Sequence, residues 1–207
     1  MSMPLVFVVG DSISIQYGPY LEKELEGHFR YARKSGEEEA LKDLDHPQGA
    51  NGGDSSMVLD YLKVMRQDPE FRPDILLLNA GLHDIKSDPE TGRKQVPIEQ
   101  YEQNLRDIIA LMHEIEAPLV WVRTTPVLDA IHNDASRGFH RYDSDLRAYN
   151  EVADKIMRAA AISLIDLHTF TEKLGDHAFC DHVHFTEEVR AQQATFIADY
   201  LKTHCCD

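Results

Sequence analysis

Four short apolar runs, spread along the sequence, most constrain what this chain can fold into. They are PLVFVV at residues 4–9, DILLLN at 74–79, PLVWVRT at 118–124 and ISLIDL at 162–167. Each is nearly continuous and rich in Val, Leu and Ile, which is typical of a strand buried on both faces of a parallel sheet. We expect a fifth, weaker strand at 28–33, where basic residues interrupt the pattern.

Segments with helical patterning lie between and after these runs. The segment 97–116 shows it best, because apolar residues recur at helical spacing and Pro97 stands near its start. Other helices are expected at 14–26, 55–67, 141–160 and 186–203. The alternation predicts an α/β fold in which right-handed crossovers connect parallel strands. With about five strands, we expect a flavodoxin-like α/β/α sandwich whose sheet has the order 2-1-3-4-5.

The length and charge of the chain narrow its organisation and its partners. A chain of 207 residues suits a single domain spanning 1–207, and no low-complexity tract or linker divides it. The formal net charge of −15 argues against nucleic acid or an anionic membrane as a partner, since both are polyanions. No apolar run is long enough to span a bilayer.

The first residues and the cysteines favour a cytoplasmic location. The opening MSMPLVFVVGDS lacks a basic region and a small-residue cleavage site, so we interpret its apolar run as a strand and not as a signal peptide. Three cysteines, Cys180, Cys205 and Cys206, do not make a disulfide framework. A reducing compartment fits this usage best.

Small and chemically active residues follow the predicted strands. GDS at 10–12 follows the first, NAGLHD at 79–84 begins where the third ends, and DHAFCDHVH at 176–184 comes just before the last helix. In open α/β sheets, ligands bind beyond the C-terminal ends of the strands. We therefore expect these segments to meet at one edge of the sheet.

Ser12, His184 and Asp181 are the residue types that nucleophilic catalysis needs. A serine hydroxyl requires a general base, and a histidine whose other ring nitrogen donates to a carboxylate is such a base. Ser12 lies where a strand turns into a helix, and the unpaired N–H groups of a first helical turn favour an anion there. The tripeptide GDS recurs at 53–55, but there it follows a polar loop and opens a helix. Ser12 is therefore the candidate nucleophile.

In four short blocks the chain resembles the GDSL, or SGNH, hydrolases, a superfamily of serine esterases and lipases. GDS at 10–12 is similar to the first block, and Gly53 to the glycine of the second. GLHD at 81–84 is similar to the third block, and DHVH at 181–184 to the last. The blocks occur in the family's order and span nearly the whole chain.

The resemblance implies a carboxylic ester hydrolase with a catalytic triad of Ser12, His184 and Asp181. It also implies a flavodoxin-like fold, and an oxyanion hole that includes the backbone N–H groups of Ser12 and Gly53. This chemistry needs no cofactor and no metal ion.

His83 is the main departure from the family pattern, because the family has an asparagine in its place. That asparagine donates a hydrogen bond to the oxyanion, and an imidazole N–H is able to do the same. We therefore predict His83 as the third donor of the oxyanion hole. Two alternatives stay open: His83 is a structural or substrate-contacting residue and only two donors operate, or the amide of Asn79 supplies the missing hydrogen bond.

The expected substrate is a small-molecule ester with a short acyl group, such as acetate, on a polar or carbohydrate alcohol. The loops at 34–54 and 126–142 are polar and acidic, whereas a long lipid chain would need an apolar groove. The family also includes lysophospholipases and thioesterases, so a lipolytic hydrolase is an alternative.

Two further classes stay open. The His, Asp and Cys residues at 176–184 have the donor types of a zinc site, which suggests a metal-dependent hydrolase, although their spacing matches no familiar motif. The other class is a non-catalytic binding domain, because a fold does not determine a function. For Asp84 we expect a structural role, in which its carboxylate binds backbone N–H groups.

Overall fold

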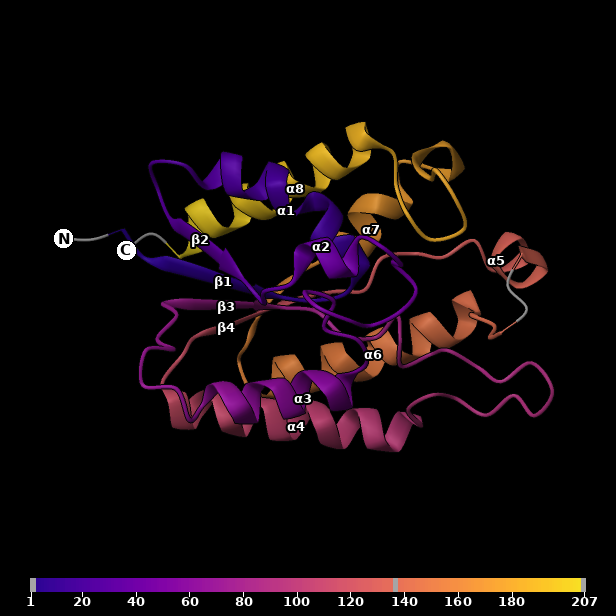
Figure 1. Cartoon of the computed structure of the whole chain (residues 1–207), viewed down its shortest axis with the longest axis horizontal. Helices are drawn as coiled ribbons and strands as arrows, with labels where there is room; N and C mark the ends of the chain where they lie inside the picture. The colour runs from indigo at the N-terminus through magenta and orange to yellow at the C-terminus, as the bar shows by residue number, and fades with distance from the viewer. Residues whose placement is uncertain (1–2, 136–137, 206–207) are drawn as a thin grey trace.

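The computed structural model describes residues 3–135 and 138–205, and its centre is a parallel sheet of five strands (Figure 1). The strands are β1 (Leu5–Val9), β2 (Arg30–Arg33), β3 (Ile75–Leu78), β4 (Leu119–Val122) and β5 (Ser163–Ile165). Their order in the sheet is β2-β1-β3-β4-β5, with every neighbouring pair parallel. The predicted fold class and strand order are confirmed.

Helices cover both faces of the sheet and form the two outer layers (Figure 1). One face carries α1 (Ser12–Leu25), α7 (Leu167–Glu172) and α8 (Glu187–His204). The other face carries α3 (Ser55–Met65), α4 (Ile98–Ile115) and α6 (Asp143–Ala159). Helix α1 packs against α8, and α4 packs against both α3 and α6. Each layer therefore joins segments that are distant in the sequence.

The strands and the five long helices lie within two residues of their predicted ends. Three short helices were not predicted: α2 (Glu37–Ala40), α5 (Asp129–Ala135) and α7. A 3₁₀ turn, η1 (Asp176–Ala178), precedes the segment that carries the last sequence motif. Both α2 and α5 lie inside stretches that the sequence indicated only as polar loops, because so few residues carry no readable helical period.

The burial of each strand explains its composition. Strands β3 and β4 are buried at every position, and both consist entirely of Leu, Ile, Val and Trp. Strand β2 is at one end of the sheet, which explains why it tolerates Arg30 on its exposed side. Its other arginine, Arg33, is buried and donates from Nη1 to the Ser14 carbonyl oxygen at 3.0 Å.

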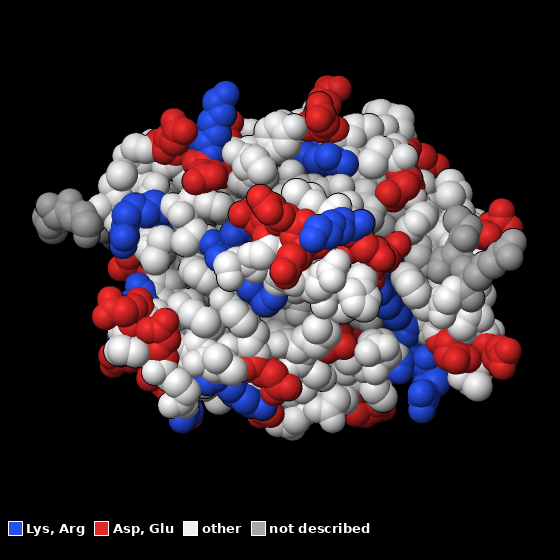
Figure 2. Space-filling view, in the orientation of Figure 1, with Lys and Arg blue, Asp and Glu red and all other residues white. Residues whose placement is uncertain are grey.

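The charged side chains of the described residues are mixed on the face shown in Figure 2. Lys and Arg lie between Asp and Glu there and do not merge into one basic patch. Within the described part of the chain, no helix has both the length and the apolar character needed to cross a bilayer.

Candidate active site

Ser12, His184 and Asp181 form a continuous chain of hydrogen bonds at the C-terminal edge of the sheet. Ser12 opens α1 directly after β1, whereas the other two residues lie between η1 and α8. His184 Nε2 is 3.0 Å from Ser12 Oγ, and His184 Nδ1 is 2.7 Å from Asp181 Oδ2. The structure thus brings together the three residues that the sequence proposed, although the first and last are 172 positions apart.

A tight turn holds the Asp181 carboxylate against the His184 ring. Its Oδ1 accepts the N–H groups of Val183 at 2.8 Å and of His184 at 2.7 Å, which leaves Oδ2 for the ring. Burial acts to raise the pKa of Asp181, but the hydrogen bonds from the His184 ring and from these two N–H groups outweigh it. The pKa of Asp181 therefore lies well below its usual range, so the carboxylate is ionised at neutral pH.

The first turn of α1 presents Ser12 in a polar, buried setting. Asp11 caps the helix, and its Oδ1 accepts the Ile13 N–H at 2.9 Å. Because the first N–H groups of a helix have no acceptor within the helix, the Ser12 N–H is left to bind another group. Ser12 itself is buried, as are Asp11 and His184.

His83 lies in the loop after β3 and is only 2% exposed. Its Nε2 is buried and has no hydrogen-bond partner among the described residues. Burial, followed by the positive charges of Lys86 and Arg141, holds the pKa of His83 well below its usual value. The ring is therefore neutral at pH 7 and has one N–H to donate. A buried polar atom without a partner is costly, which points to a group that binds there.

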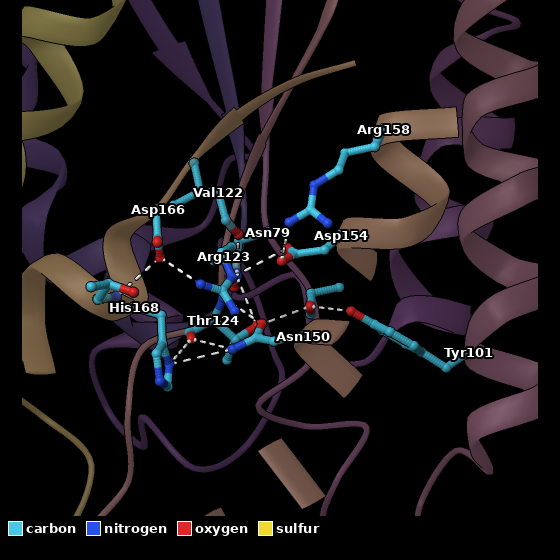
Figure 3. Close-up of polar contacts among 12 residues, drawn as sticks. Asn79, Tyr101, Val122, Arg123, Thr124, Asn150, Asp154, Arg158, Asp166 and His168 are labelled. Atoms are coloured by element: carbon cyan, nitrogen blue, oxygen red, sulfur yellow. Dashed lines mark hydrogen bonds and ion pairs between the residues drawn. The ribbon is translucent and has the colours of Figure 1, made fainter. Parts of the chain in front are cut away.

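Asn79 is engaged elsewhere, as Figure 3 shows. Its Nδ2 donates to the Val122 carbonyl oxygen at 2.9 Å and to Thr124 Oγ1 at 3.1 Å. These two bonds use both hydrogens of the amide and tie the end of β3 to the end of β4. The contacts favour His83 over Asn79 as the residue that takes the place of the family's asparagine.

Gly53 has a backbone conformation that a side chain would disturb. Its φ is +73°, and an added Cβ would lie 2.6 Å from Met57 Sδ and 2.9 Å from Pro47 Cβ. Its N–H, a predicted oxyanion donor, donates to Asn51 Oδ1 at 3.0 Å. An oxyanion at this position would therefore share the N–H with Asn51 or replace it.

Asp84 joins the loop of His83 to the start of α3. Its carboxylate accepts the Ser55 N–H at 3.0 Å and also the Ser55 hydroxyl. Burial, opposed by these bonds from Ser55, raises the pKa of Asp84 to about 7. The neighbouring Asp54 caps α3 through the N–H groups of Ser56 and Met57. These contacts agree with the structural role expected for Asp84, and they tie the start of α3 to the loop of His83.

The potential metal ligands at 176–184 do not converge. His182 Nδ1 lies 2.7 Å from Nδ1 of His132 on α5, His184 is held by Asp181 and Ser12, and Cys180 is exposed. Within residues 3–135 and 138–205, no three His, Cys, Asp or Glu side chains are placed to hold a metal ion. The metal-dependent hydrolase considered from the sequence therefore has no assembled set of metal ligands in this part of the chain.

Arg141 is a residue of the site that sequence reasoning missed. Its guanidinium is buried, and Nε donates to the Leu82 carbonyl oxygen at 3.0 Å. A single arginine in a polar loop carries no sequence signal for such a position.

A polar cleft of about 820 Å³ adjoins these loops. Pro47 lines it, and the same residue lies against Gly53. The charged residues in the wall are balanced in sign, with three carboxylates and three basic side chains: Asp43, Asp45, Asp88, Lys86, Arg93 and Lys94. Ser12, Asp181 and His184 are not among the residues that line this cleft.

A serine, a histidine and an aspartate thus lie in hydrogen-bond contact at the C-terminal edge of a five-stranded parallel sheet. The chain belongs to the GDSL-like lipase/acylhydrolase family, whose model matches residues 8–191. The resemblance found in the sequence blocks is confirmed. No curated protein sequence matches the chain significantly.

Several solved structures share the fold at low sequence identity. The lipase/acylhydrolase from Enterococcus faecalis has a TM-score of 0.71 at 14% identity, with 97% of this chain and 96% of that chain covered. The acetyl xylan esterase AlAXEase has a TM-score of 0.66 at 15% identity, with 96% and 98% covered. TesA has a TM-score of 0.65 at 18% identity, also with 96% and 98% covered.

Proposed function

We propose that this chain is a serine esterase that hydrolyses carboxylic esters through an acyl-enzyme intermediate. The observation that carries the proposal is the hydrogen-bonded series from Asp181 through His184 to Ser12. In it the serine has its base, and the base has an orienting carboxylate that is ionised at neutral pH.

In the first half of the reaction, Ser12 Oγ attacks the ester carbonyl carbon while His184 Nε2 takes the hydroxyl proton. Asp181 stabilises the imidazolium that forms. The tetrahedral intermediate then collapses, the bond to the alcohol oxygen breaks, and His184 returns the proton to the leaving alcohol. In the second half, water attacks the acyl carbon while His184 takes its proton; the bond between the acyl carbon and Ser12 Oγ then breaks, and His184 returns the proton to Ser12 Oγ as the acid leaves.

The negative charge of the tetrahedral oxygen needs donors that are already in place. We assign the N–H groups of Ser12 and Gly53 and a ring N–H of His83 to this role. The buried Nε2 of His83, with no partner among the described residues, supports its assignment. For Gly53, the oxyanion would compete with Asn51 Oδ1 for the N–H.

The substrate we propose is a short-acyl ester, such as an acetate, of a polar or carbohydrate alcohol. The polar cleft beside Gly53 supports a hydroxyl-rich alcohol. One protein with the same fold is an acetyl xylan esterase, which agrees with this class. A cytoplasmic location belongs to the same proposal and is supported by the exposed free thiol of Cys180.

Labelling with a fluorophosphonate, with and without a chelator, tests the reaction class. Modification at Ser12, insensitive to the chelator and lost in Ser12→Ala, supports the esterase. Ester hydrolysis that the chelator abolishes, without labelling, would identify a metal-dependent hydrolase. Neither labelling nor hydrolysis would identify a binding domain.

A panel of p-nitrophenyl esters of rising chain length tests the acyl group. We expect the acetate ester to have the highest kcat/KM. A clear preference for the octanoate ester would contradict the short-acyl proposal and favour a lipolytic hydrolase.

A further inference from the structure

Arg141 is buried beside the proposed oxyanion hole, with only 1% of its surface exposed. Its position is fixed by backbone pairing of the preceding residue: His140 and Ser87 exchange two N–H···O bonds of 2.8 Å. The guanidinium lies over the Phe139 ring, at 4.8 Å from its centroid. Arg141 is thus held in place before any substrate binds.

The hydrogen bond from Arg141 Nε to the Leu82 carbonyl oxygen affects His83, the residue that follows Leu82 in the chain. The Leu82 carbonyl and the His83 N–H belong to one planar peptide unit, so holding one atom of the unit orients the rest. A hydrogen bond from a charged donor is stronger than a neutral one. The 3.0 Å contact therefore fixes the backbone from which the His83 ring extends.

The second contact of Arg141 is an ion pair with Asp45, at 3.2 Å between Nη1 and Oδ1. The Asp45 side chain is 39% exposed, so water screens much of this attraction. The partner of Nε, in contrast, is a neutral carbonyl. Two further carboxylates, Asp11 and Asp181, also act electrostatically on the guanidinium, less strongly than Asp45.

Charged and titratable groups from four loops face the His83 ring. Lys86 comes from the loop of His83 itself, His46 from the loop before α3, Arg141 from the loop before α6, and His184 from the loop before α8. Burial contributes most to lowering the pKa of His83, and Lys86 and Arg141 follow. A neutral ring keeps its N–H as a donor, and nearby fixed positive charge favours the anion that this donor would bind.

We propose that Arg141 is a positioning residue of the oxyanion hole, which holds the Leu82–His83 peptide and sets a buried positive charge beside the His83 ring. This role depends on the proposed function, in which His83 donates to the oxyanion. A merely structural arginine would stabilise the loops, and its loss would affect folding without a selective effect through His83.

Steady-state kinetics of Arg141→Met and Arg141→Lys with p-nitrophenyl acetate are the first test. Met removes the charge and both hydrogen bonds, so kcat should fall between ~10-fold and ~10²-fold, less than the loss of a whole donor. KM should stay within ~3-fold. Lys keeps the charge without the planar fork, so it should retain more activity than Met.

Two control variants distinguish an arginine that positions the Leu82–His83 peptide from one that only anchors the loop of Asp45. Asp45→Asn removes the ion pair but leaves the bond to Leu82, so kcat should fall less than ~3-fold. Arg106→Met removes an exposed arginine on α4 whose partner is Glu102 of the same helix, and should change neither constant. If Asp45→Asn loses as much activity as Arg141→Met, Arg141 is a loop anchor and the proposal is wrong.

A double-mutant cycle tests whether Arg141 acts through His83. In a His83→Ala background, Arg141→Met should lower kcat by less than ~3-fold, because the group it positions is already absent. Losses that multiply in full would overturn the proposal. His83→Ala alone reports on the proposed donor, so the failure of that assignment is visible separately.

A readout that needs no activity is the titration of the His83 ring by ¹⁵N NMR, with its signals identified by their absence in His83→Ala. The midpoint should be higher in Arg141→Met than in the wild type, because the variant lacks the neighbouring positive charge. An unchanged midpoint in a folded Arg141→Met protein would overturn the proposal. If Arg141→Met does not fold, the kinetic cycle with Arg141→Lys decides. An inactive wild type would contradict the proposed function, while the NMR titration would still test the effect of Arg141 on the His83 ring.

Discussion

His83 is the residue on which the proposed mechanism departs from the family pattern. Its neutral ring and its buried Nε2, which has no partner in the part of the chain that the structure describes, fit a hydrogen-bond donor for an anion. Asn79, the other candidate, holds two strands together with its amide. We propose that the imidazole of His83 takes over the task that an amide performs in the family.

His83→Ala should lower kcat by about 10²–10³-fold, the usual cost of removing one oxyanion donor. His83→Asn should retain more activity, since its amide also donates a hydrogen bond. Steady-state kinetics of both variants with p-nitrophenyl acetate measure this. Turnover of His83→Ala within a few-fold of the wild type would show that only two donors operate.

Ser12 and Ser55 occur in the same tripeptide but should respond differently to replacement. Ser12→Ala should lower kcat by roughly 10⁴-fold or more with an unchanged melting temperature, because the nucleophile is lost. Ser55→Ala should instead lower the free energy of unfolding by about 1–3 kcal/mol, since it leaves Asp84 and Asn104 without their shared hydroxyl partner. Kinetics and urea unfolding of both variants measure the contrast. A catalytic loss in Ser55→Ala comparable to that in Ser12→Ala would contradict it.

At the scale of elements, the turn before α3 needs a glycine. At Gly53 the positive φ and the contacts with Met57 and Pro47 both oppose a side chain. Gly27 has a similar φ of +79° but open space around it, which makes it a matched control. Gly27→Ala should cost about 1–2 kcal/mol from the backbone alone.

Gly53→Ala should destabilise the chain by more than Gly27→Ala, because the added methyl group must also displace packed atoms. It should lower kcat as well, since the displaced backbone carries a proposed donor. Thermal unfolding and kinetics of both variants measure this. Equal destabilisation with unchanged kcat in Gly53→Ala would indicate that its N–H has no part in the reaction.

The elements that the sequence predicted are those with a strong local signal. Continuous apolar runs predicted four of the strands, and the weaker, interrupted pattern at 28–33 proved to be β2, whose place at the end of the sheet explains its basic residues. The short helix α5 carried too few residues for a readable period. The contact between Arg141 and Asp45 joins positions 96 apart, so neither residue shows it locally. The roles proposed for Gly53 and His83 came from block order, which is a property of the family and not of local propensity.

For the molecule as a whole, the site joins loops from almost the entire chain around a buried, mixed set of charges. The net charge of −15 belongs to the chain as a whole, whereas Lys86 and Arg141 place positive charge next to His83. In contrast to these two basic residues, Asp84 carries a carboxyl group, which is completely buried and accepts a hydrogen bond from the Ser55 N–H. Its protonation couples the stability of the whole fold to pH.

The stability of the chain should depend on pH through Asp84. Its pKa is about 7 in the folded chain against an ordinary value of 3.8, so the folded state binds the proton more tightly. The resulting stabilisation is complete below about pH 4 and is lost as the pH rises through 7. Between pH 5 and 8 this amounts to about 2–3 kcal/mol. Asp84→Asn, which does not titrate, should lack this part of the pH dependence.

Urea unfolding of the wild type and Asp84→Asn at pH 5 and pH 8 measures the difference. The free energy of unfolding of the wild type, relative to the variant, should fall by about 2–3 kcal/mol between the two values. Other carboxyl groups titrate in both proteins and cancel in this comparison. Parallel pH profiles would mean that Asp84 is ionised at pH 5 as well as at pH 8, its charge stabilised by the two bonds from Ser55 despite its burial.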